Sequence, residues 1–409
     1  MGLLYTFSIF LFQLGIKIAA LFNPKAKQAI EGRKRLFKKL EKDFQQPAQT
    51  IWIHCASLGE FEQARPLIEM IKSQKADKKI LLTFFSPSGY NAQKNYELAD
   101  VVSYLPMDFP KNARRFLEIV QPDAAIFVKY EFWFNFLKAL RKRKIPSYLV
   151  SGIFWPHQHF FKYYGQWFAG QLSVYKHFFV QNNLSASLLQ AIGYKNVTIS
   201  GDSRFDRVIK LSKETFTSNR LRSFCAKHKA IIFGSSWSKE EKMAAAAAKQ
   251  FPTEKIIIAP HEIKAGNIQE LKASFSNAIL WSETSEQTDL STYQVLIIDQ
   301  IGLLSKVYRF GKIAIIGGGF GAGIHNTLEA AVYGCPLLFG PNYQRFQEAH
   351  DLIACGAAKV IHDEAGFLEQ LNLWIADEEK RTQASEAAKV YVKKNAGATR
   401  TIFDTIFNS

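Results

Sequence analysis

Short apolar runs alternate with longer amphipathic stretches along most of this chain, between Ile51 and Gly366. The runs have the length of β-strands and the stretches the length of α-helices, which is the order that a parallel sheet with crossover helices requires. The pattern therefore predicts an α/β fold built from two series of strands. The expected strands are Ile51–Cys55, Ile80–Phe85, Ala124–Val128, Ser147–Val150 and His177–Val180 in the first half, and Ala230–Gly234, Lys255–Ala259, Val295–Ile298, Ile313–Ile316 and Pro336–Phe339 in the second.

A polar, charged segment between Phe205 and Lys227 separates the two series and contains no strand-like run. The chain has 409 residues, which is more than one hydrophobic core usually accommodates, so two domains are expected. After Gly366 the sequence is amphipathic and helical, without a third domain. We therefore expect a membrane-associated segment over residues 1–22, a first Rossmann-like domain over 23–205 and a second over 206–409.

The chain opens with an apolar segment, Leu3–Phe22, of about the length that spans a bilayer, although Gln13 and Lys17 interrupt it. A dense block of Lys and Arg follows between Lys25 and Lys42. This order disfavours a cleaved signal peptide and places the following domain in the cytoplasm. The segment either crosses the membrane or lies in its surface with Lys17 reaching the headgroups. A buried first helix of a soluble domain is a third interpretation.

The composition narrows the range of partners. Lys and Arg total 52 and Asp and Glu 36, so the formal net charge is +16, which suits an anionic membrane surface. The basic block lacks interleaved aromatic residues, and the chain has no zinc-finger spacing or RNA-binding signature, so we expect no nucleic-acid partner. The four cysteines form no C-x-x-C pair, which argues against a zinc site or a disulfide framework and fits a reducing compartment.

Two carboxylates follow expected strands of the first half. Glu60 lies between the strand that ends at Cys55 and a helix expected to begin near Phe61, and Glu131 follows the strand Ala124–Val128. Loops at the carboxyl ends of parallel strands line the ligand crevice of such folds. A carboxylate in this position can act as a general base for a hydroxyl group, and it can equally cap a helix.

A glycine-rich loop follows the expected strand Ile313–Ile316 and leads into a helix, where backbone N–H groups can hold a phosphate. Glu329 lies one helical turn after Asn326, so both side chains can meet the same ligand, such as a ribose. Loops after two other strands of this half fit the same pocket, through Ser235 and Ser236 and through Pro260 and His261.

Several common chemistries are disfavoured. The glycine run only partly matches G-x-G-x-x-G and no acidic residue stands at the distance that a dinucleotide ribose requires, which argues against NAD. The sequence has neither a Walker A motif nor the G-x-S-x-G motif of hydrolases. No His or Cys pair has the spacing of metal ligands, so we expect no metal site.

The ordered set of motifs resembles the bacterial Kdo (3-deoxy-D-manno-octulosonic acid) transferases, which have a GT-B architecture of two Rossmann-like domains facing a cleft. The likeness spans nearly the whole chain. The matching pieces are the apolar N-terminus, Ser57-x-Gly59-Glu60, Tyr104-Leu-Pro106-x-Asp108, Glu131-x-Trp133-x-Asn135, Gly201-Asp-Ser-Arg204-Phe205-Asp206, Ala259-Pro-His261, and His325-Asn326-x-Leu328-Glu329 before Gly340-Pro341.

The resemblance implies an inverting glycosyltransferase that moves Kdo from CMP-Kdo to lipid IVA, a lipid A precursor, at the cytoplasmic face of the bacterial inner membrane, without a metal or other cofactor. By position, Glu60 would be the catalytic base, and Glu131 and Arg204 would assist the transition state. The residues expected to bind the donor are Ser235, Ser236, Pro260, His261, Ile301, Gly302, Leu303, Gly318, Gly319, His325, Asn326, Thr327, Leu328 and Glu329.

Two other functions stay open at this point. The first is a GT-B transferase that uses a UDP- or GDP-sugar, because such an enzyme would share the glycine-rich loop and the position of Glu329. The second is a basic peripheral membrane protein without enzymatic activity.

Overall fold

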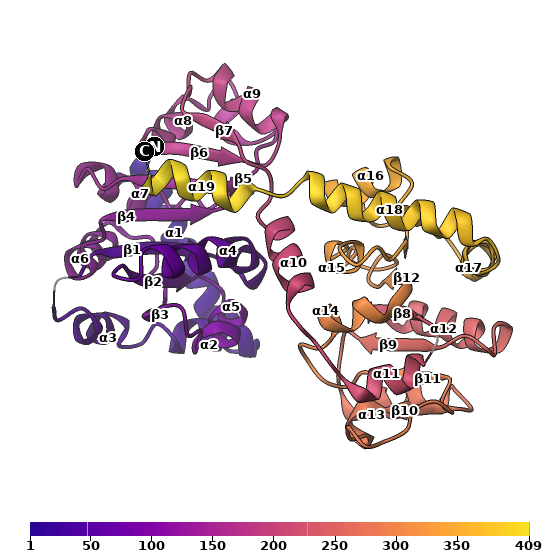
Figure 1. Ribbon diagram of the computed structural model, residues 1–409. Helices are drawn as coiled ribbons and strands as arrows, with labels where there is room; N and C mark the ends of the chain where they lie inside the picture. The colour runs from indigo at the N-terminus through magenta and orange to yellow at the C-terminus, as the bar shows by residue number, and fades with distance from the viewer. Residues whose placement is uncertain (47, 227, 409) are drawn as a thin grey trace. The chain divides into compact units, whose positions relative to one another are not determined.

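The computed structural model describes residues 1–46, 48–226 and 228–408 and divides the chain into two compact units (Figure 1). Unit 1 comprises Met1–Arg207 together with the chain from Ala396 onward, and unit 2 comprises Val208–Asn395. The division falls within helix α10 (Arg204–Lys213), inside the segment where the join was expected. Lys227, the far end of that segment, lies outside the described residues.

The expected extent of the second domain, 206–409, is wrong at its C-terminal end. Helix α19 (Ala398–Phe407) returns to unit 1 and packs on α4 (Leu58–Gln74), where Ile402 and Phe403 are buried in the core. An amphipathic pattern shows that a helix has an apolar face but does not show which domain this face covers. The sequence therefore did not reveal the return.

Unit 1 is built on a seven-stranded parallel sheet with the strand order β3-β2-β1-β4-β5-β6-β7. Successive side chains of β1 point to opposite faces, so Ile51 and Ile53 pack with α4 and α19, and Trp52 packs on the other face with α6 and α7. The strands are β1 (Thr50–Cys55), β2 (Lys79–Phe84), β3 (Val101–Tyr104), β4 (Ala124–Val128), β5 (Ser147–Gly152), β6 (Tyr175–Val180) and β7 (Val197–Ile199). The further helices are α1 (Gly2–Ala19), α2 (Pro24–Glu31), α3 (Leu36–Asp43), α5 (Pro87–Gln93), α6 (Pro110–Val120), α7 (Phe134–Lys142), α8 (Gln166–Gln171) and α9 (Asn183–Ala191).

Unit 2 contains a second seven-stranded parallel sheet with the order β10-β11-β9-β8-β12-β13-β14. Its core is formed by apolar side chains of the central strands packed against α12 and α17. The strands are β8 (Ala230–Ser236), β9 (Ile256–Pro260), β10 (Ala278–Leu280), β11 (Val295–Ile297), β12 (Gly311–Ile316), β13 (Leu337–Phe339) and β14 (Ala358–Val360). The helices are α11 (Asn219–Cys225), α12 (Ser238–Gln250), α13 (Ala265–Ala273), α14 (Leu304–Val307), α15 (Leu328–Ala331), α16 (Gln347–Ala354), α17 (Glu364–Ala376) and α18 (Glu378–Lys394).

The expected strands are all present, with ends that differ by at most two residues. The strands that the pattern missed are β3, β7, β10 and β14, which are the edge strands of the two sheets. Each has only three or four residues. Such segments are too short to establish a periodicity, and they are held by pairing with a neighbouring strand rather than by a long apolar run.

Each sheet contains a switch point, where the connections from two adjacent strands lead to opposite sides. In unit 1 the switch point lies between β1 and β4, and in unit 2 between β8 and β12. The loops that follow two such strands diverge and leave a crevice at the carboxyl end of the sheet. Glu60 lies in the first turn of the helix after β1 and Glu131 in the loop after β4, while Ser236 is the last residue of β8 and the glycine run follows β12. The topology thus marks the same two places that the motifs indicate.

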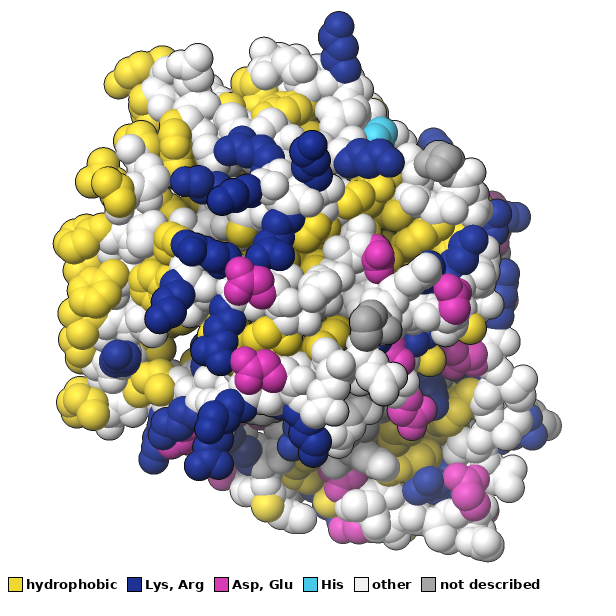
Figure 2. All heavy atoms as spheres, turned by 90° about the vertical axis from the view of Figure 1, so that its left-hand side faces the viewer, with side chains coloured by type: hydrophobic (Ala, Val, Ile, Leu, Met, Phe, Trp, Pro, Cys, Tyr) yellow, Lys and Arg dark blue, Asp and Glu magenta, His cyan; other side chains and the backbone are white. Residues whose placement is uncertain are grey.

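Helix α1 lies on the surface of unit 1 and has one side docked. The Tyr5 hydroxyl donates a hydrogen bond to Asp108 (2.6 Å), Ile9 is buried, and Phe12 stacks on Phe85 with ring centroids 6.0 Å apart. The exposed apolar side chains of α1 are Leu3, Leu4, Phe7, Phe10, Leu11, Phe12, Leu14 and Ile18. Figure 2 shows exposed apolar side chains along one margin of the molecule, next to a group of Lys and Arg side chains. Length and hydropathy would allow α1 to cross a membrane, and 6% of this helix is buried.

Candidate functional site

Glu60 occupies the N-terminal turn of α4, which begins at Leu58 and thus earlier than expected. It forms a capping box with Ser57, because Oε2 of Glu60 accepts hydrogen bonds from the backbone N–H groups of Ala56 and Ser57. None of the described residues donates a hydrogen bond to Oε1. The capping alternative therefore holds for one carboxylate oxygen and leaves the other available.

The electrostatic surroundings of Glu60 favour its protonated form. Burial raises its pKa, and the charge of Glu131 raises it further; the hydrogen bonds from Ala56 and Ser57 and the charge of Lys129 lower it again, and the resulting pKa is about 8. A general base is most effective when its pKa lies near the working pH. A pKa in this range suits Glu60 for removing a proton from a hydroxyl group.

Glu131 lies in the loop after β4 and is held by aromatic and imidazole groups. The indole N–H of Trp133 donates a hydrogen bond to Oε2 of Glu131 (2.7 Å), and Nε2 of the buried His54 lies 3.5 Å from the same oxygen. The Tyr175 hydroxyl donates to the backbone carbonyl of Glu131 (3.3 Å). The structure thus brings Glu131 within electrostatic range of Glu60 and fixes it from several sides.

Arg204, at the start of α10, pairs with Asp202. Its Nε and Nη2 atoms each lie 2.8 Å from Oδ2 of Asp202. Burial alone would raise the pKa of Asp202, but the Arg204 guanidinium and several hydrogen bonds outweigh this effect and lower it. Oδ2 also accepts a hydrogen bond from Gln63 of α4 (3.2 Å). Arg204 is therefore anchored to the helix that carries Glu60.

In unit 2, three ring systems from three loops stack at the β8–β12 switch point. The Trp237 and His261 rings lie 4.6 Å apart between centroids, and the His261 and His325 rings lie 4.4 Å apart. Together with the glycine loop they line a pocket of about 510 Å³, which also includes Lys239 and Phe320. Burial lowers the pKa of His325, and the neighbouring His261 lowers it further. The pocket offers flat rings for a base and one exposed cation for a phosphate.

The glycine loop departs from the expected phosphate cradle. The backbone N–H of Gly318 donates to Oε1 of Glu240 (2.9 Å), and those of Gly321 and Gly323 donate to the carbonyl of Gly318. The helix that follows, α15, has only four residues. The backbone N–H of Gly318 is therefore already paired with a protein carboxylate, that of Glu240 at the start of α12. Gly319 lies against Gly340, whose backbone nitrogen is 2.5 Å from the position of an added Cβ atom.

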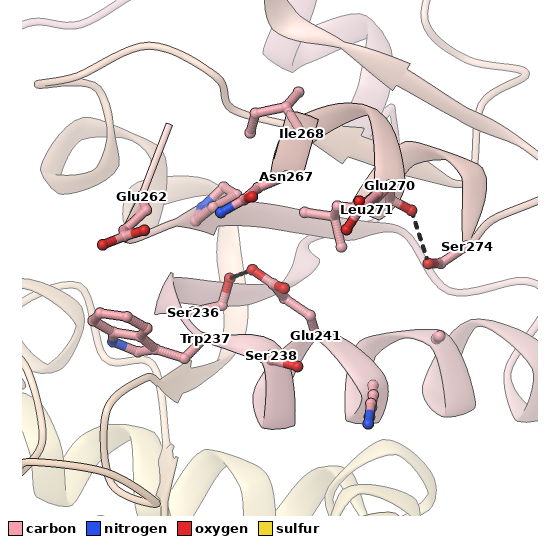
Figure 3. A pocket seen from close by; sticks show the side chains of 13 residues that line it. Ser236, Trp237, Ser238, Glu241, Glu262, Asn267, Ile268, Glu270, Leu271 and Ser274 are labelled. Atoms are coloured by element: carbon pink, nitrogen blue, oxygen red, sulfur yellow. Dashed lines mark hydrogen bonds between the residues drawn. The ribbon is translucent and has the colours of Figure 1, made fainter. Parts of the chain in front are cut away.

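A second pocket, of about 390 Å³, lies between α12 and α13 (Figure 3). Ser236 and Pro260 line it, so the residues expected at one nucleotide site are distributed over two pockets. Figure 3 shows the Ser236 hydroxyl directed at Glu241, to which it donates a hydrogen bond of 3.3 Å, with Asn267 and Glu270 of α13 on the opposite side. Ser235, the residue before Ser236, does not line this pocket and has a left-handed backbone conformation with φ +52°.

The remaining predicted donor residues line neither of these two pockets among the described residues. Ile301 is exposed, Gly302 has φ +89° and Leu303 precedes α14. The Asn326 side chain donates to Glu329 (2.9 Å) and accepts from the N–H of Leu328 (3.1 Å). Thr327 and Leu328 are buried. The structure thus brings Asn326 and Glu329 together, as their spacing predicts.

Three side chains that the motifs did not single out help to form these sites: His54, Trp237 and Glu240. His54 shares a sheet face with Trp52 because of the two-residue period of β1, which is a signal that the sequence contains. Glu240 stands at the third position of α12, where an acid usually caps its own helix. The hydrogen bond that Glu240 accepts from the distant Gly318 is a tertiary contact, which no local sequence pattern predicts. Within the described residues, no group of three or more His, Cys, Asp or Glu side chains could hold a metal ion.

Comparisons with known proteins agree with this geometry. In solved structures, the chain is similar to UDP-GlcNAc 2-epimerase from Neisseria meningitidis (TM-score 0.63, 14% identity, covering 88% of this chain and 100% of the other). It is also similar to MurG from Acinetobacter baumannii (TM-score 0.54, 14% identity, 89% and 100%). Two Rossmann-like units of this kind define the GT-B fold.

The family follows from sequence comparison. Residues 30–207 match the family model described as 3-deoxy-D-manno-octulosonic-acid transferase (kdotransferase). The 3-deoxy-D-manno-octulosonic acid transferase of Chlamydia muridarum is 28% identical over 85% of this chain and 83% of its own length. The transferase of the same name from Bordetella pertussis is 27% identical over 88% and 87%. Residues 30–207 thus match the Kdo transferase family, the chain is similar to Kdo transferases over most of its length, and it is a glycosyltransferase.

Proposed function

We propose that this enzyme transfers Kdo from CMP-Kdo to a sugar hydroxyl of lipid IVA. The observation that carries the proposal is the pair of carboxylates, the buried Glu60 and the half-buried Glu131, at the switch point of the unit that matches the Kdo transferase model. An acceptor with a sugar hydroxyl needs a base at this place, and Glu60 has a pKa that fits it.

The proposed reaction is a single displacement. Glu60 takes the proton of the acceptor hydroxyl, the oxygen forms a bond to the anomeric carbon of Kdo, and the bond from that carbon to the CMP phosphate breaks. The attacking oxygen enters opposite the leaving phosphate, so the anomeric configuration inverts. The charge that develops on CMP is met by preorganised positive groups, for which Arg204 and Lys239 are the candidates. We expect no metal to take part.

The donor nucleotide is assigned to unit 2. The stack of Trp237, His261 and His325 provides flat faces for a cytosine ring, and the Asn326–Glu329 pair provides acceptors for ribose hydroxyls. Gly318 is withdrawn from phosphate binding in this proposal, because Glu240 already accepts its hydrogen.

The lipid acceptor is assigned to a membrane surface that α1 contacts. One side of α1 is docked on unit 1 from Tyr5 to Phe12, while its other apolar side chains are exposed, and the Lys- and Arg-rich segment 25–42 follows it in the chain. A helix held along a domain in this way favours an in-plane position over a membrane crossing. We place the enzyme at the cytoplasmic face of the inner membrane.

The test is to incubate the purified full chain with CMP-Kdo and lipid IVA and to weigh the products by mass spectrometry. We expect lipid products heavier by whole Kdo increments, whose number also reports how many sugars are added, and an unchanged yield with EDTA. Competition by CMP but not by UDP would support the donor. Transfer from a UDP- or GDP-sugar instead, or lipid binding without transfer from any nucleotide sugar, would contradict the proposal.

A further inference from the structure

His54 is a buried histidine of β1 whose imidazole lies next to the carboxylate of Glu131. Its side chain is fully buried, Nε2 lies 3.5 Å from Oε2 of Glu131, and Nδ1 lies 2.9 Å from Oγ1 of Thr83 on β2. A buried imidazole between a hydroxyl and a carboxylate has a defined arrangement of hydrogens, because each nitrogen either donates or accepts.

The neighbours of Thr83 determine this arrangement. The indole N–H of Trp52 is a donor only, and it donates to Oγ1 of Thr83 (2.8 Å). The single hydroxyl hydrogen of Thr83 has two acceptors in reach, Nδ1 of His54 at 2.9 Å and the carbonyl of Ile53 at 3.5 Å. The closer acceptor is Nδ1. When Nδ1 accepts this hydrogen, the neutral ring carries its own hydrogen on Nε2, which faces Glu131.

Trp133 completes the arrangement. Its indole N–H lies 2.7 Å from Oε2 of Glu131 and 3.1 Å from Nε2 of His54. Since Nε2 already carries a hydrogen, the indole hydrogen goes to the carboxylate. Both N–H groups then converge on one oxygen of Glu131. The His54 distance is long for a hydrogen bond, so the imidazole acts mainly through its dipole in this geometry.

We infer that His54 is a positioning residue for Glu131, fixed by Trp52 and Thr83 with its hydrogen on Nε2, and that it orients the Glu131 carboxylate beside Glu60. This inference rests on the proposed function insofar as Glu131 assists transfer. The other titratable side chains whose charge acts on or responds to Glu131 are Tyr5, Cys55, Glu60, Tyr130 and Tyr175. Among these, Glu60 is the group through which a misplaced Glu131 would change the rate.

The first test does not depend on transfer. Nitrogen-15 NMR of the full chain with labelled histidine, at a pH where the ring is neutral, should show His54 with a protonated Nε2 and an unprotonated Nδ1. Thr83→Val removes the hydroxyl donor and should weaken this preference. A wild-type ring protonated on Nδ1 would overturn the inference, even if the enzyme proves to use another donor or acceptor.

The second test is kinetic and compares matched variants. His54→Leu removes the donor, and we expect kcat to fall about 10- to 100-fold, with an unchanged KM for the nucleotide sugar and a displaced acid limb of the pH profile. His54→Gln keeps an N–H near the position of Nε2 and should restore part of kcat and return the limb. His177→Gln is the control, because His177 of β6 pairs with Thr198 (2.8 Å) in the same sheet and has no carboxylate partner among the described residues.

Three kinetic outcomes would contradict the positioning role of His54. An unchanged kcat and pH limb in His54→Leu, or equal losses in His54→Leu and His54→Gln, would overturn the inference, as would an equal effect of His177→Gln. If His54→Leu does not fold, Thr83→Val takes its place, since it leaves the imidazole in the core. We then expect a smaller fall in kcat and a shift of the acid limb in the same direction.

Discussion

At the scale of single residues, Glu60 caps a helix through hydrogen bonds that lower its pKa, and yet its pKa is raised overall. One oxygen caps α4, and the group as a whole has a pKa raised to about 8 by burial and by Glu131. The hydrogen bonds hold the carboxylate in place, while desolvation keeps its affinity for protons high. The charge of Glu131 therefore contributes to the proton affinity of Glu60, so a change at Glu131 changes the pKa of Glu60.

The first prediction concerns the pH dependence of transfer. As a base, Glu60 acts when deprotonated, so kcat/KM should rise as the pH passes through about 8. Glu131→Gln removes the charge that raises this pKa, so the acid limb should move to lower pH. Glu60→Gln should abolish the limb and lower the rate by roughly 10²- to 10⁴-fold. Measuring kcat/KM against pH for the wild type and both variants tests this prediction. An acid limb that stays in place in Glu131→Gln would show that the charge of Glu131 does not raise the pKa of Glu60.

The second prediction concerns stability and has a definite sign. The pKa of Glu60 is higher in the folded protein than its ordinary value of 4.5, so its contribution to stability is present below that value and is lost as the pH rises through about 8. Glu60→Gln removes the ionisation. Relative to the wild type, the variant should therefore change little at about pH 4, gain stability progressively as the pH rises from about 4.5 to about 8, and keep the full gain at about pH 9. Urea unfolding at both pH values measures the difference.

The third prediction uses the Asp202–Arg204 pair. Arg204→Ala leaves the buried Asp202 carboxylate without its cation, and we expect a loss of about 3–5 kcal/mol in the free energy of unfolding. Adding Asp202→Asn should recover much of this loss, because the uncompensated charge is gone. Transfer should stay low in the double variant if Arg204 assists the transition state. Recovered transfer would limit Arg204 to a structural role.

At the scale of elements, one side of α1 is docked on unit 1, and we assign its exposed apolar side to the membrane. Tyr5 and Phe12 attach it to Asp108 and Phe85, and Phe85 in turn stacks on Trp133 beside Glu131. Asp108 also accepts hydrogen bonds from the backbone N–H groups of Asn135 and Phe136 at the start of α7. The segment that carries Glu131 is thus braced by the helix that we assign to the membrane.

The fourth prediction follows from this division. Replacing the exposed Phe7 and Phe10 by Ser should weaken binding to anionic lipid vesicles and leave the thermal transition of unit 1 nearly unchanged. Tyr5→Phe should do the opposite, lowering the free energy of unfolding by about 1–3 kcal/mol because Asp108 loses a donor, with vesicle binding retained. Flotation and calorimetry of both variants distinguish the two sides of the helix.

At the scale of the whole molecule, the sequence predicted the central strands and the switch-point loops but not the parts held by distant contacts. Ala124–Val128 was predicted without error because buried parallel strands are continuous apolar runs. Gly318 was expected to bind phosphate, but no local pattern in the sequence predicts that Glu240, at the start of another helix, accepts the hydrogen of the Gly318 N–H. The roles of the predicted site residues remain predictions that the kinetic tests address.

The last prediction concerns α19, which belongs to unit 1 although it follows unit 2 in the chain. Its start is held by Asp206, which accepts hydrogen bonds from the N–H groups of Gly397 (2.6 Å) and Thr399 (2.7 Å). Phe403 is fully buried against the face of α4, the helix that begins with the Glu60 capping box. Phe403→Ala should lower the stability of unit 1 by about 3–5 kcal/mol.

The loss should be confined to unit 1, because the fold of unit 2 ends at Asn395. Hydrogen exchange should therefore become faster in α4 and β1 and stay unchanged in α12 and β8, and CMP binding should persist while transfer falls. Arg400→Ser, at an exposed position of the same helix, is the control. Faster exchange in unit 2 would show that the return of the chain stabilises both units and that the two units do not unfold independently.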